Sequence, residues 1–184
     1  MSTEMIISVM SRDRTGIVAD VTGAIYELGG DLADLNQSTL GGYLTMILFA
    51  TFDDGISPAI IMEKIDTIKS PTTLDVVARE ISVTPQSEHS ELPPKTYIMT
   101  TQGKNRKGLV YGISSFCFEH DINILDLATT ISGDTYTMVL QLDLSRVKSI
   151  ARVRNALEGY AVSQRLQIVL QHHDLFKVTN EIPF

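Results

Sequence analysis

The feature that most constrains this 184-residue chain is an internal repeat. Residues 5–52 match residues 97–144 without a gap, at an offset of 97 − 5 = 92 positions, with 11 identical pairs among the 48 aligned residues. The best-matched segments are Arg14–Val18 with Arg106–Val110 and Thr45–Leu48 with Thr137–Leu140. A self-match of this length indicates two copies of one small domain.

Within each copy, apolar residues alternate between strand-like and helix-like spacing. A short apolar run is followed by a glycine and then by apolar positions three and four residues apart, which is typical of a strand leading into a helix. Gly41-Gly42 and Gly133-Asp134 each predict a two-residue hairpin turn. The first copy is expected to contain strands 5–10, 31–40, 43–52 and 73–83 and helices 17–28 and 57–68; the second, strands 96–102, 122–132, 134–144 and 164–171 and helices 108–121 and 146–159.

The order strand-helix-strand-strand-helix-strand predicts an α+β class fold. In this ferredoxin-like arrangement a four-stranded antiparallel sheet carries both helices on one face. Domains are expected at residues 1–83 and 96–184, joined by a polar, proline-bearing linker at 84–95. In the strand after the first helix, alternation places Ala33 and Leu35 on one face, and likewise Leu125 and Leu127. At the end of the chain, Leu175, Val178 and Ile182 have the spacing of one apolar stripe on a short helix, and we expect this segment to dock on the body of the protein.

Two stretches recur in both copies. The first copy has the turn Asp13-Arg14-Thr15-Gly16-Ile17 before its first helix and Leu28-Gly29-Gly30-Asp31 after it. The second copy has Asn105-Arg106-Lys107-Gly108-Leu109 and Asp121-Ile122-Asn123-Ile124 in the same places. These stretches resemble the motifs of the ACT domain family. Both copies depart from the family pattern at its proline, where Thr15 and Lys107 stand. As free-standing tandem domains they are similar to the glycine cleavage system transcriptional repressor group.

The resemblance implies a regulatory, non-catalytic protein that binds a small molecule, most simply an amino acid, near these turns or at an interface between domains. A helix start leaves N–H groups free for a carboxylate. Carried over residue by residue, the family's ligand-binding positions are Asp13, Arg14, Gly16, Ile17 and Asp31 in the first copy and Asn105, Arg106, Gly108, Leu109 and Asn123 in the second. An asparagine pair can hold either end of a zwitterion, whereas two aspartates suit only its ammonium group. The second copy is therefore the better amino-acid site.

Each candidate residue also has a structural interpretation. Arg14 and Arg106 could capture an anion or form salt bridges that fix the turn. Asp13 could bind ligand or cap the turn. Cys117 falls at an apolar helical position and is expected in the core rather than as a nucleophile. His172 and His173 could suggest a metal, but adjacent strand residues point to opposite faces, so no metal or cofactor is expected. No phosphate-loop, H-E-x-x-H, G-x-S-x-G or C-x-x-C motif is present.

Charge and composition limit the possible partners. Residues 1–84 carry 5 basic and 12 acidic side chains, a net charge of −7, which argues against nucleic-acid binding there. With no long apolar run and one cysteine, the chain is expected to be cytoplasmic and not membrane-bound. The two copies are expected to pair within one molecule and the chain to form a homodimer, because each sheet has a face and edges that need cover. The implied regulatory role predicts a protein partner as well. The alternative is an assembly module that binds other proteins without any ligand.

Overall fold

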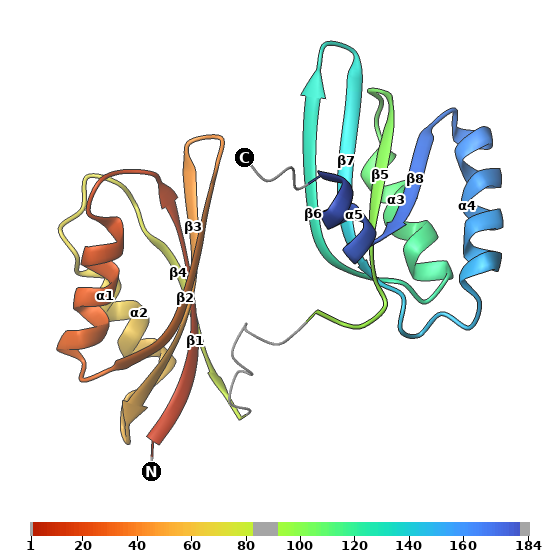
Figure 1. The fold of residues 1–184 in the computed structure, drawn as a ribbon. Helices are drawn as coiled ribbons and strands as arrows, with labels where there is room; N and C mark the ends of the chain where they lie inside the picture. The colour runs from red at the N-terminus through yellow and green to blue at the C-terminus, as the bar shows by residue number, and fades with distance from the viewer. Residues whose placement is uncertain (1, 83–91, 181–184) are drawn as a thin grey trace. The chain divides into compact units, whose positions relative to one another are not determined.

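The computed structural model describes residues 2–82 and 92–180, so residues 84–91 of the expected linker lie outside the described part. The chain divides into two compact units, Met1–Ser90 and Glu91–Phe184 (Figure 1). The elements of the first unit are β1 (Ser2–Arg12), α1 (Ile17–Glu27), β2 (Asp31–Leu40), β3 (Tyr43–Asp53), α2 (Pro58–Asp66) and β4 (Asp75–Ile81). Those of the second are β5 (Thr96–Lys104), α3 (Leu109–Glu119), β6 (Asn123–Ser132), β7 (Thr135–Asp143), α4 (Ile150–Gln164), β8 (Gln167–His172) and α5 (His173–Asn180).

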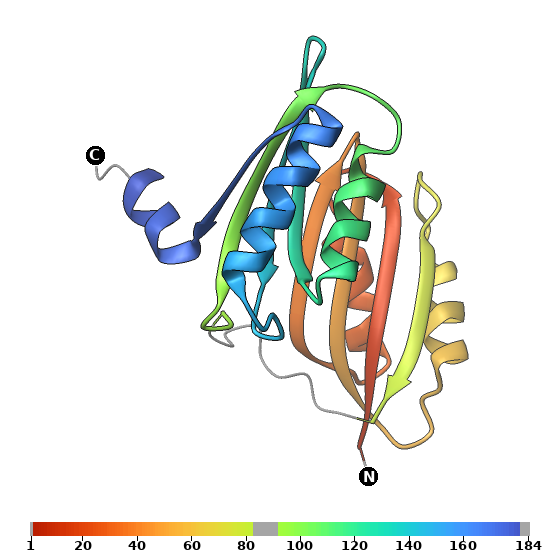
Figure 2. The same cartoon turned by 90° about the vertical axis from the view of Figure 1, so that its right-hand side faces the viewer.

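Each unit is a four-stranded antiparallel sheet with two helices on one face, which confirms the α+β prediction (Figure 2). The strand orders are β2-β3-β1-β4 and β6-β7-β5-β8, so the first strand of each copy is central and the strand after the first helix lies at an edge. We call the helix-bearing side of each sheet its inner face and the opposite side its outer face.

The hydrophobic core of each unit lies between the inner face and the helices. In β1 the buried residues Met5, Ile7 and Val9 alternate with more exposed ones, as expected when one face of a strand is covered. Ile17, Val21 and Ile25 of α1 complete this core from the helical side. The second unit repeats the arrangement with Met99, Leu109, Ile113 and Cys117 among its buried residues.

A bulge near the start of β2 and β6 makes the face prediction for these strands wrong. Leu32 pairs with Ala50 and Asp34 with Phe49, which leaves Ala33 as an extra residue; Leu125 is extra in the same way between Ile124 and Asp126. A bulge inserts one residue and reverses the alternation beyond it, so Ala33 does not share the face of Leu35. In each bulge an aspartate Oδ1 accepts a hydrogen bond from the next backbone N–H, at 2.7 Å for Asp34 and 2.8 Å for Asp126.

Serine caps set the start of the second helix in both units. The Ser57 side chain accepts from the Ile60 N–H, with Pro58 in the first turn, so the helix begins where the predicted range 57–68 places it. Ser149, 92 positions later, accepts from the Arg152 N–H and begins α4 at Ile150. The predicted range 146–159 is therefore displaced: residues 146–149 precede the helix, which continues to Gln164.

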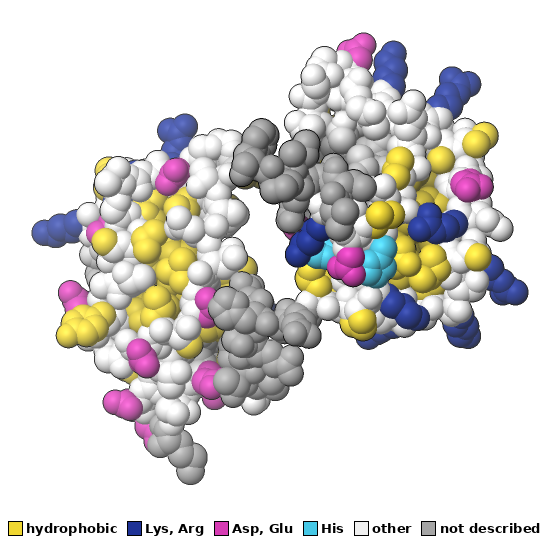
Figure 3. All heavy atoms as spheres, viewed as in Figure 1, with side chains coloured by type: hydrophobic (Ala, Val, Ile, Leu, Met, Phe, Trp, Pro, Cys, Tyr) yellow, Lys and Arg dark blue, Asp and Glu magenta, His cyan; other side chains and the backbone are white. Residues whose placement is uncertain are grey.

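The C-terminal helix α5 packs against β5 and β8 of the second unit. The outward-facing residues Thr96 and Ile98 of β5 are only 2% and 8% exposed. Where β8 leads into α5, the Nδ1 atoms of His172 and His173 lie 3.5 and 3.6 Å from the Asp174 carboxylate. Figure 3 shows histidine side chains in cyan beside acidic ones in magenta on the surface of the second unit. The tail therefore docks as a helix, as expected, although Leu175 of the predicted apolar stripe is 54% exposed. The other stripe positions, Val178 and Ile182, lie outside the side chains that the structure describes.

Candidate ligand-binding site

The turn between the first strand and first helix has the same conformation in both units. Gly16 and Gly108 begin α1 and α3 with φ of 90° and 85°, a left-handed conformation that only glycine adopts without strain. Among the described residues no side chain caps either helix start. The first-turn backbone N–H groups and the positive end of the helix dipole are therefore available to an anion.

The side chains of Ile17 and Leu109, two of the carried-over positions, belong to the core. They are 1% and 5% exposed. A ligand at these turns could meet their backbone N–H groups but not their side chains, so these residues position the helix start.

Arg14 connects the first turn to the segment that follows α2. Its guanidinium lies 2.6 Å from the Asp20 carboxylate, donates to the Ser70 hydroxyl at 2.7 Å and contacts the Thr72 hydroxyl at 3.3 Å. Nearby, the Ser11 hydroxyl bonds the Thr73 carbonyl at 2.8 Å. The positive charge of Arg14 is thus paired within its own domain.

Arg106 holds the same repeat position but has different neighbours. It donates to the side-chain and main-chain oxygens of Gln164 at 2.7 and 3.1 Å, and within residues 2–82 and 92–180 it has no carboxylate partner. The counterpart of Asp20 is Gly112, which the Tyr160 hydroxyl closely approaches. Burial raises the pKa of Tyr160 above its ordinary value of 10, and the nearby charge of Arg106 lowers it in part.

The polar candidates of each copy lie at opposite ends of its sheet. Asp31 pairs with Thr51, which lies opposite Glu4 of β1, whereas Asp13 follows Arg12 at the other end of that strand. Eight residues of strand separate the two ends, about 26 Å. Asn123 and Asn105 are separated in the same way, because Asn123 pairs with Asp143, which lies opposite Thr96. All four residues are exposed, but one small ligand cannot contact both members of a pair within one domain.

A hollow of about 380 Å³ lies beside the second-domain turn and was not anticipated from the sequence. It is lined by Gln102, Gly103, Lys104, Asp134, Thr135, Arg165 and Gln167. The Asn105 N–H donates to the Asp134 carbonyl at 2.7 Å, so the hollow adjoins the carried-over site. Lys104 could have been noted from its place one residue before Asn105. Arg165 is far from the turn in the sequence and lines the hollow only because the fold brings it there.

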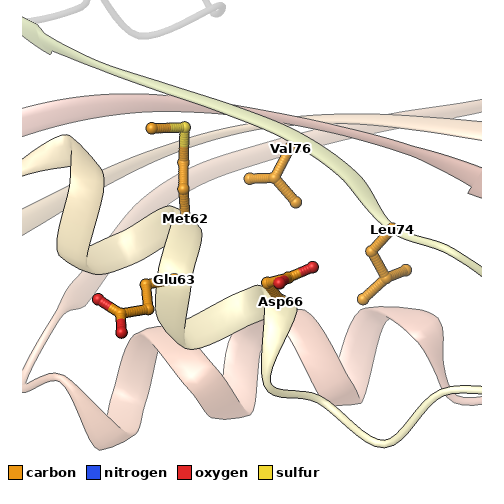
Figure 4. A pocket seen from close by; sticks show the side chains of 5 residues that line it. All are labelled: Met62, Glu63, Asp66, Leu74 and Val76. Carbon is orange, nitrogen blue, oxygen red and sulfur yellow. The ribbon is translucent and has the colours of Figure 1, made fainter.

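Another hollow of about 380 Å³ lies between α2 and β4 of the first unit. Met62, Leu74 and Val76 form its apolar wall, and Glu63 and Asp66 project from α2 beside them (Figure 4). None of its lining residues is basic, so it offers a carboxylate ligand no charged partner.

Nothing in the described residues supplies an evident reactive centre. Cys117 is 1% exposed, and burial raises the pKa of its thiol to about 11, which suppresses the reactive thiolate. Within the described ranges no three His, Cys, Asp or Glu side chains are grouped so as to hold a metal ion. In the same ranges, no helix has the length and apolar character that a membrane crossing requires.

Comparison with known proteins gives relatives whose match spans about half of the chain. A UPF0237 protein of Methanocaldococcus jannaschii is 33% identical over 86 residues, which are 46% of this chain and 96% of the relative. A UPF0237 protein of Clostridium acetobutylicum is 34% identical over 86 residues, 46% of this chain and 97% of its own length. These relatives correspond in length to one of the two domains.

Two solved structures match the tandem fold. A protein of unknown function from Galdieria sulphuraria superposes with a TM-score of 0.67 at 20% identity, covering 94% of this chain and 99% of that one. A protein provisionally assigned as a glycine cleavage system transcriptional repressor gives a TM-score of 0.58 at 14% identity, covering 93% and 97%. At these identities the likeness is one of fold. The ACT domain family model matches residues 3–76 and again residues 95–171, and the chain therefore belongs to the ACT domain family, with two such domains in tandem.

Proposed function

We propose that this protein is a non-catalytic regulator that binds an amino acid through its second ACT domain and signals to a protein partner. The family is regulatory and its domains typically bind amino acids, which supports the general class. The choice of ligand and of domain depends on the charges around the two turns.

The observation that carries the proposal is the unpaired charge of the second turn. Arg14 is neutralised by Asp20, and Asp13 adds a further negative charge beside it. At the second turn the hydrogen-bond partners of Arg106 among the described residues are all neutral, Lys104 and Arg165 line the adjoining hollow, and Lys107 lies in the turn itself. Together with the uncapped start of α3, this is a favourable environment for a carboxylate.

The separation of Asn105 from Asn123 favours a site shared by the second domains of two copies of the chain. β6 is an edge strand, and its residues 127–132 include no charged residue and no proline, which are the usual protections of an exposed edge; the same holds for β2 and its residues 35–40. When the β6 edges of two copies pair antiparallel, the beginning of one lies beside the end of the other. Asn105 of one copy and Asn123 of the second copy then face the same ligand, one for each end of a zwitterion.

A thermal-shift screen of the twenty amino acids, followed by calorimetry on any hit, tests this function. A ligand that binds only the folded state raises the melting temperature. Arg106→Gln, Asn105→Ala and Asn123→Ala should each reduce the affinity at least about tenfold, equivalent to about 1.4 kcal/mol, and leave the fold intact. Asp31→Ala, at the matching position of the first domain, is the control and should retain the response.

The same screen decides between this proposal and its alternative. A flat screen, or full affinity in all three second-domain variants, would contradict an amino-acid site at this turn. A flat screen would favour an assembly module. The unprotected edges of β2 and β6 could pair with strands of other proteins in such a module.

A further inference from the structure

The outer face of the first sheet carries an exposed apolar patch. Met10, Ile47 and Val77 are 45%, 46% and 52% exposed, and the partly buried Ile6 and Phe49 lie in the row next to Ile47 and Val77. In the second domain α5 packs against β5 and β8, and Ile98, the counterpart of Ile6, is only 8% exposed. Contiguous exposed apolar side chains of this kind mark an interaction surface.

Strand pairing places a charged residue at each end of one row on this face. Phe49 lies opposite Ile6, Asp34 lies beside Phe49 on β2, and Arg79 lies beside Ile6 on β4. The row therefore runs Asp34, Phe49, Ile6, Arg79 across the four strands. In the described parts of the chain neither Asp34 nor Arg79 has an ion-pair partner, and Arg79 is exposed.

We propose that this face is a self-complementary interface on which two copies of the chain pack, related by a two-fold axis parallel to the strands between β1 and β3. Such an axis exchanges the two ends of each row. Asp34 of one copy then faces Arg79 of the second copy, twice by symmetry, and Phe49 faces Ile6 at the centre.

The acidic side chains of two further rows agree with that axis. Strand pairing gives the row Asp31, Thr51, Glu4, Ile81 on one side, and on the other the uncharged row Asn36, Ile47, Ser8, Val77 followed by Ser38, Thr45, Met10, Asp75. Exchanging the row ends places Asp75 over Ser38 and Glu4 over Thr51, so no acidic side chain faces another. A two-fold axis perpendicular to the strands would instead stack Asp34 on Asp34 and Arg79 on Arg79. The charges therefore select both the occupant and its orientation.

The outer face of the second sheet is a poorer occupant. Its corresponding row is Asp126, Gln141, Ile98, Gln171, which could offer Arg79 one carboxylate but offers Asp34 no cation. The Ile98 end of that face is also where α5 packs. A second copy of the first sheet offers an ion-pair partner to both Asp34 and Arg79, and the apolar patch of the first sheet is exposed and can contact it.

Sedimentation velocity of the full chain at low salt, across micromolar concentrations, measures the association. We expect a dimer that weakens as sodium chloride is added. Arg79→Asp places two carboxylates together at both ends of the interface and should raise the dimer dissociation constant at least about tenfold. Adding Asp34→Asn to Arg79→Asp should recover part of that loss. The amide oxygen can still accept from the Leu35 N–H, so the bulge is retained.

Controls separate the interface from general effects of charge and folding. Lys69→Asp makes a similar charge change at an exposed residue after α2 and should leave the dissociation constant unchanged. If Arg79→Asp loses its native circular dichroism, Ser8→Asp replaces it as the test. Ser8 is exposed at the centre of the same face, opposite Ile47 and Val77. A chain that stays monomeric, or a dimer that tolerates a folded variant at residue 79 or 8, would overturn the proposal.

Discussion

Thr101 in β5 takes the place that Val9 takes in β1, and its hydroxyl is buried without a hydrogen-bond partner in the part of the chain that the structure describes. Val9 lies opposite Met46 and Thr101 lies opposite Met138, the same position of the repeat. A buried polar atom that loses water without gaining a partner destabilises the folded state.

Thr101→Val should therefore stabilise the second domain. Valine has nearly the shape of threonine, and the substitution removes the unpaired hydroxyl, so the free energy of unfolding should rise by about 1–2 kcal/mol. Urea denaturation measures the change. Thr100→Val, on the outer face of the same strand, is the matched control and should have little effect. A loss of stability in Thr101→Val would show that the hydroxyl has a partner.

Gly30→Ala should destabilise the first domain. A β-carbon at residue 30 would lie 2.5 Å from the Phe52 ring and 2.7 Å from the Ile25 side chain, both buried. Overpacking of this kind costs about 1–3 kcal/mol. The second domain has Ile122 at this position, with Leu144 and Cys117 as the smaller counterparts of Phe52 and Ile25. Adding Phe52→Leu should therefore restore part of the stability, which denaturant titration of both variants would measure.

The Cys117 thiol should make stability fall at high pH. Its pKa is raised by burial from 9.0 to about 11, so the unfolded chain releases the proton first as pH rises. The contribution of this thiol to the free energy of unfolding is fully present below about pH 9. Between about pH 9 and 11 the free energy of unfolding falls by at most about 3 kcal/mol because of this group. Comparing the pH dependence of the wild type with that of Cys117→Val isolates the contribution. Identical curves above pH 9 would contradict it. Thiol reagents should also modify Cys117 only after unfolding.

Removal of residues 174–184 should destabilise the second domain. The deletion takes away nearly all of α5 and exposes Ile98 and Thr96 of β5. Burial of one large apolar side chain contributes about 1.5–3 kcal/mol, so the melting temperature should fall by several degrees. Deleting only 181–184 leaves α5 in place and is the control. Equal melting temperatures for the two truncations would mean that the helix contributes no stability.

The repeat and its apolar periodicity predicted most of the fold. Strands 31–40 and 43–52 and the Ser57 cap follow directly from spacing and turn residues. The start of α4 was missed because Arg146 and Lys148 resemble helix residues in isolation. The residue that matches Ser57 at the repeat offset is Ser149, and this match would have located the start of α4. The bulges were not predicted, because Ala33 and Leu35 are both apolar and an inserted residue at Ala33 does not disturb the apolar alternation of the sequence.

The candidate site was less predictable, because its chemistry depends on contacts between distant segments. The turn at Asp13–Ile17 was located from its motif. That Arg14 reaches Asp20, Ser70 and Thr72, whereas Arg106 reaches Gln164, depends on how the segment after the second helix packs. Asn105 and Asn123 lie at opposite ends of the sheet because its strands are antiparallel. The predicted order of elements already implied this topology, so their separation could have been predicted.

The edge position of β2 has a consequence for hydrogen exchange. β2 pairs with β3 on one side only, so alternate backbone amides between Leu35 and Leu40 point away from the sheet. In a free edge these amides exchange rapidly while their neighbours are protected, giving a pattern with a period of two residues. Pairing with another edge strand would slow the rapid set and erase the pattern. Packing on the outer face would leave those amides unbonded and preserve it. Amide exchange rates from Leu35 to Leu40 thus distinguish edge pairing from packing on the outer face, two modes of association that sedimentation alone does not separate.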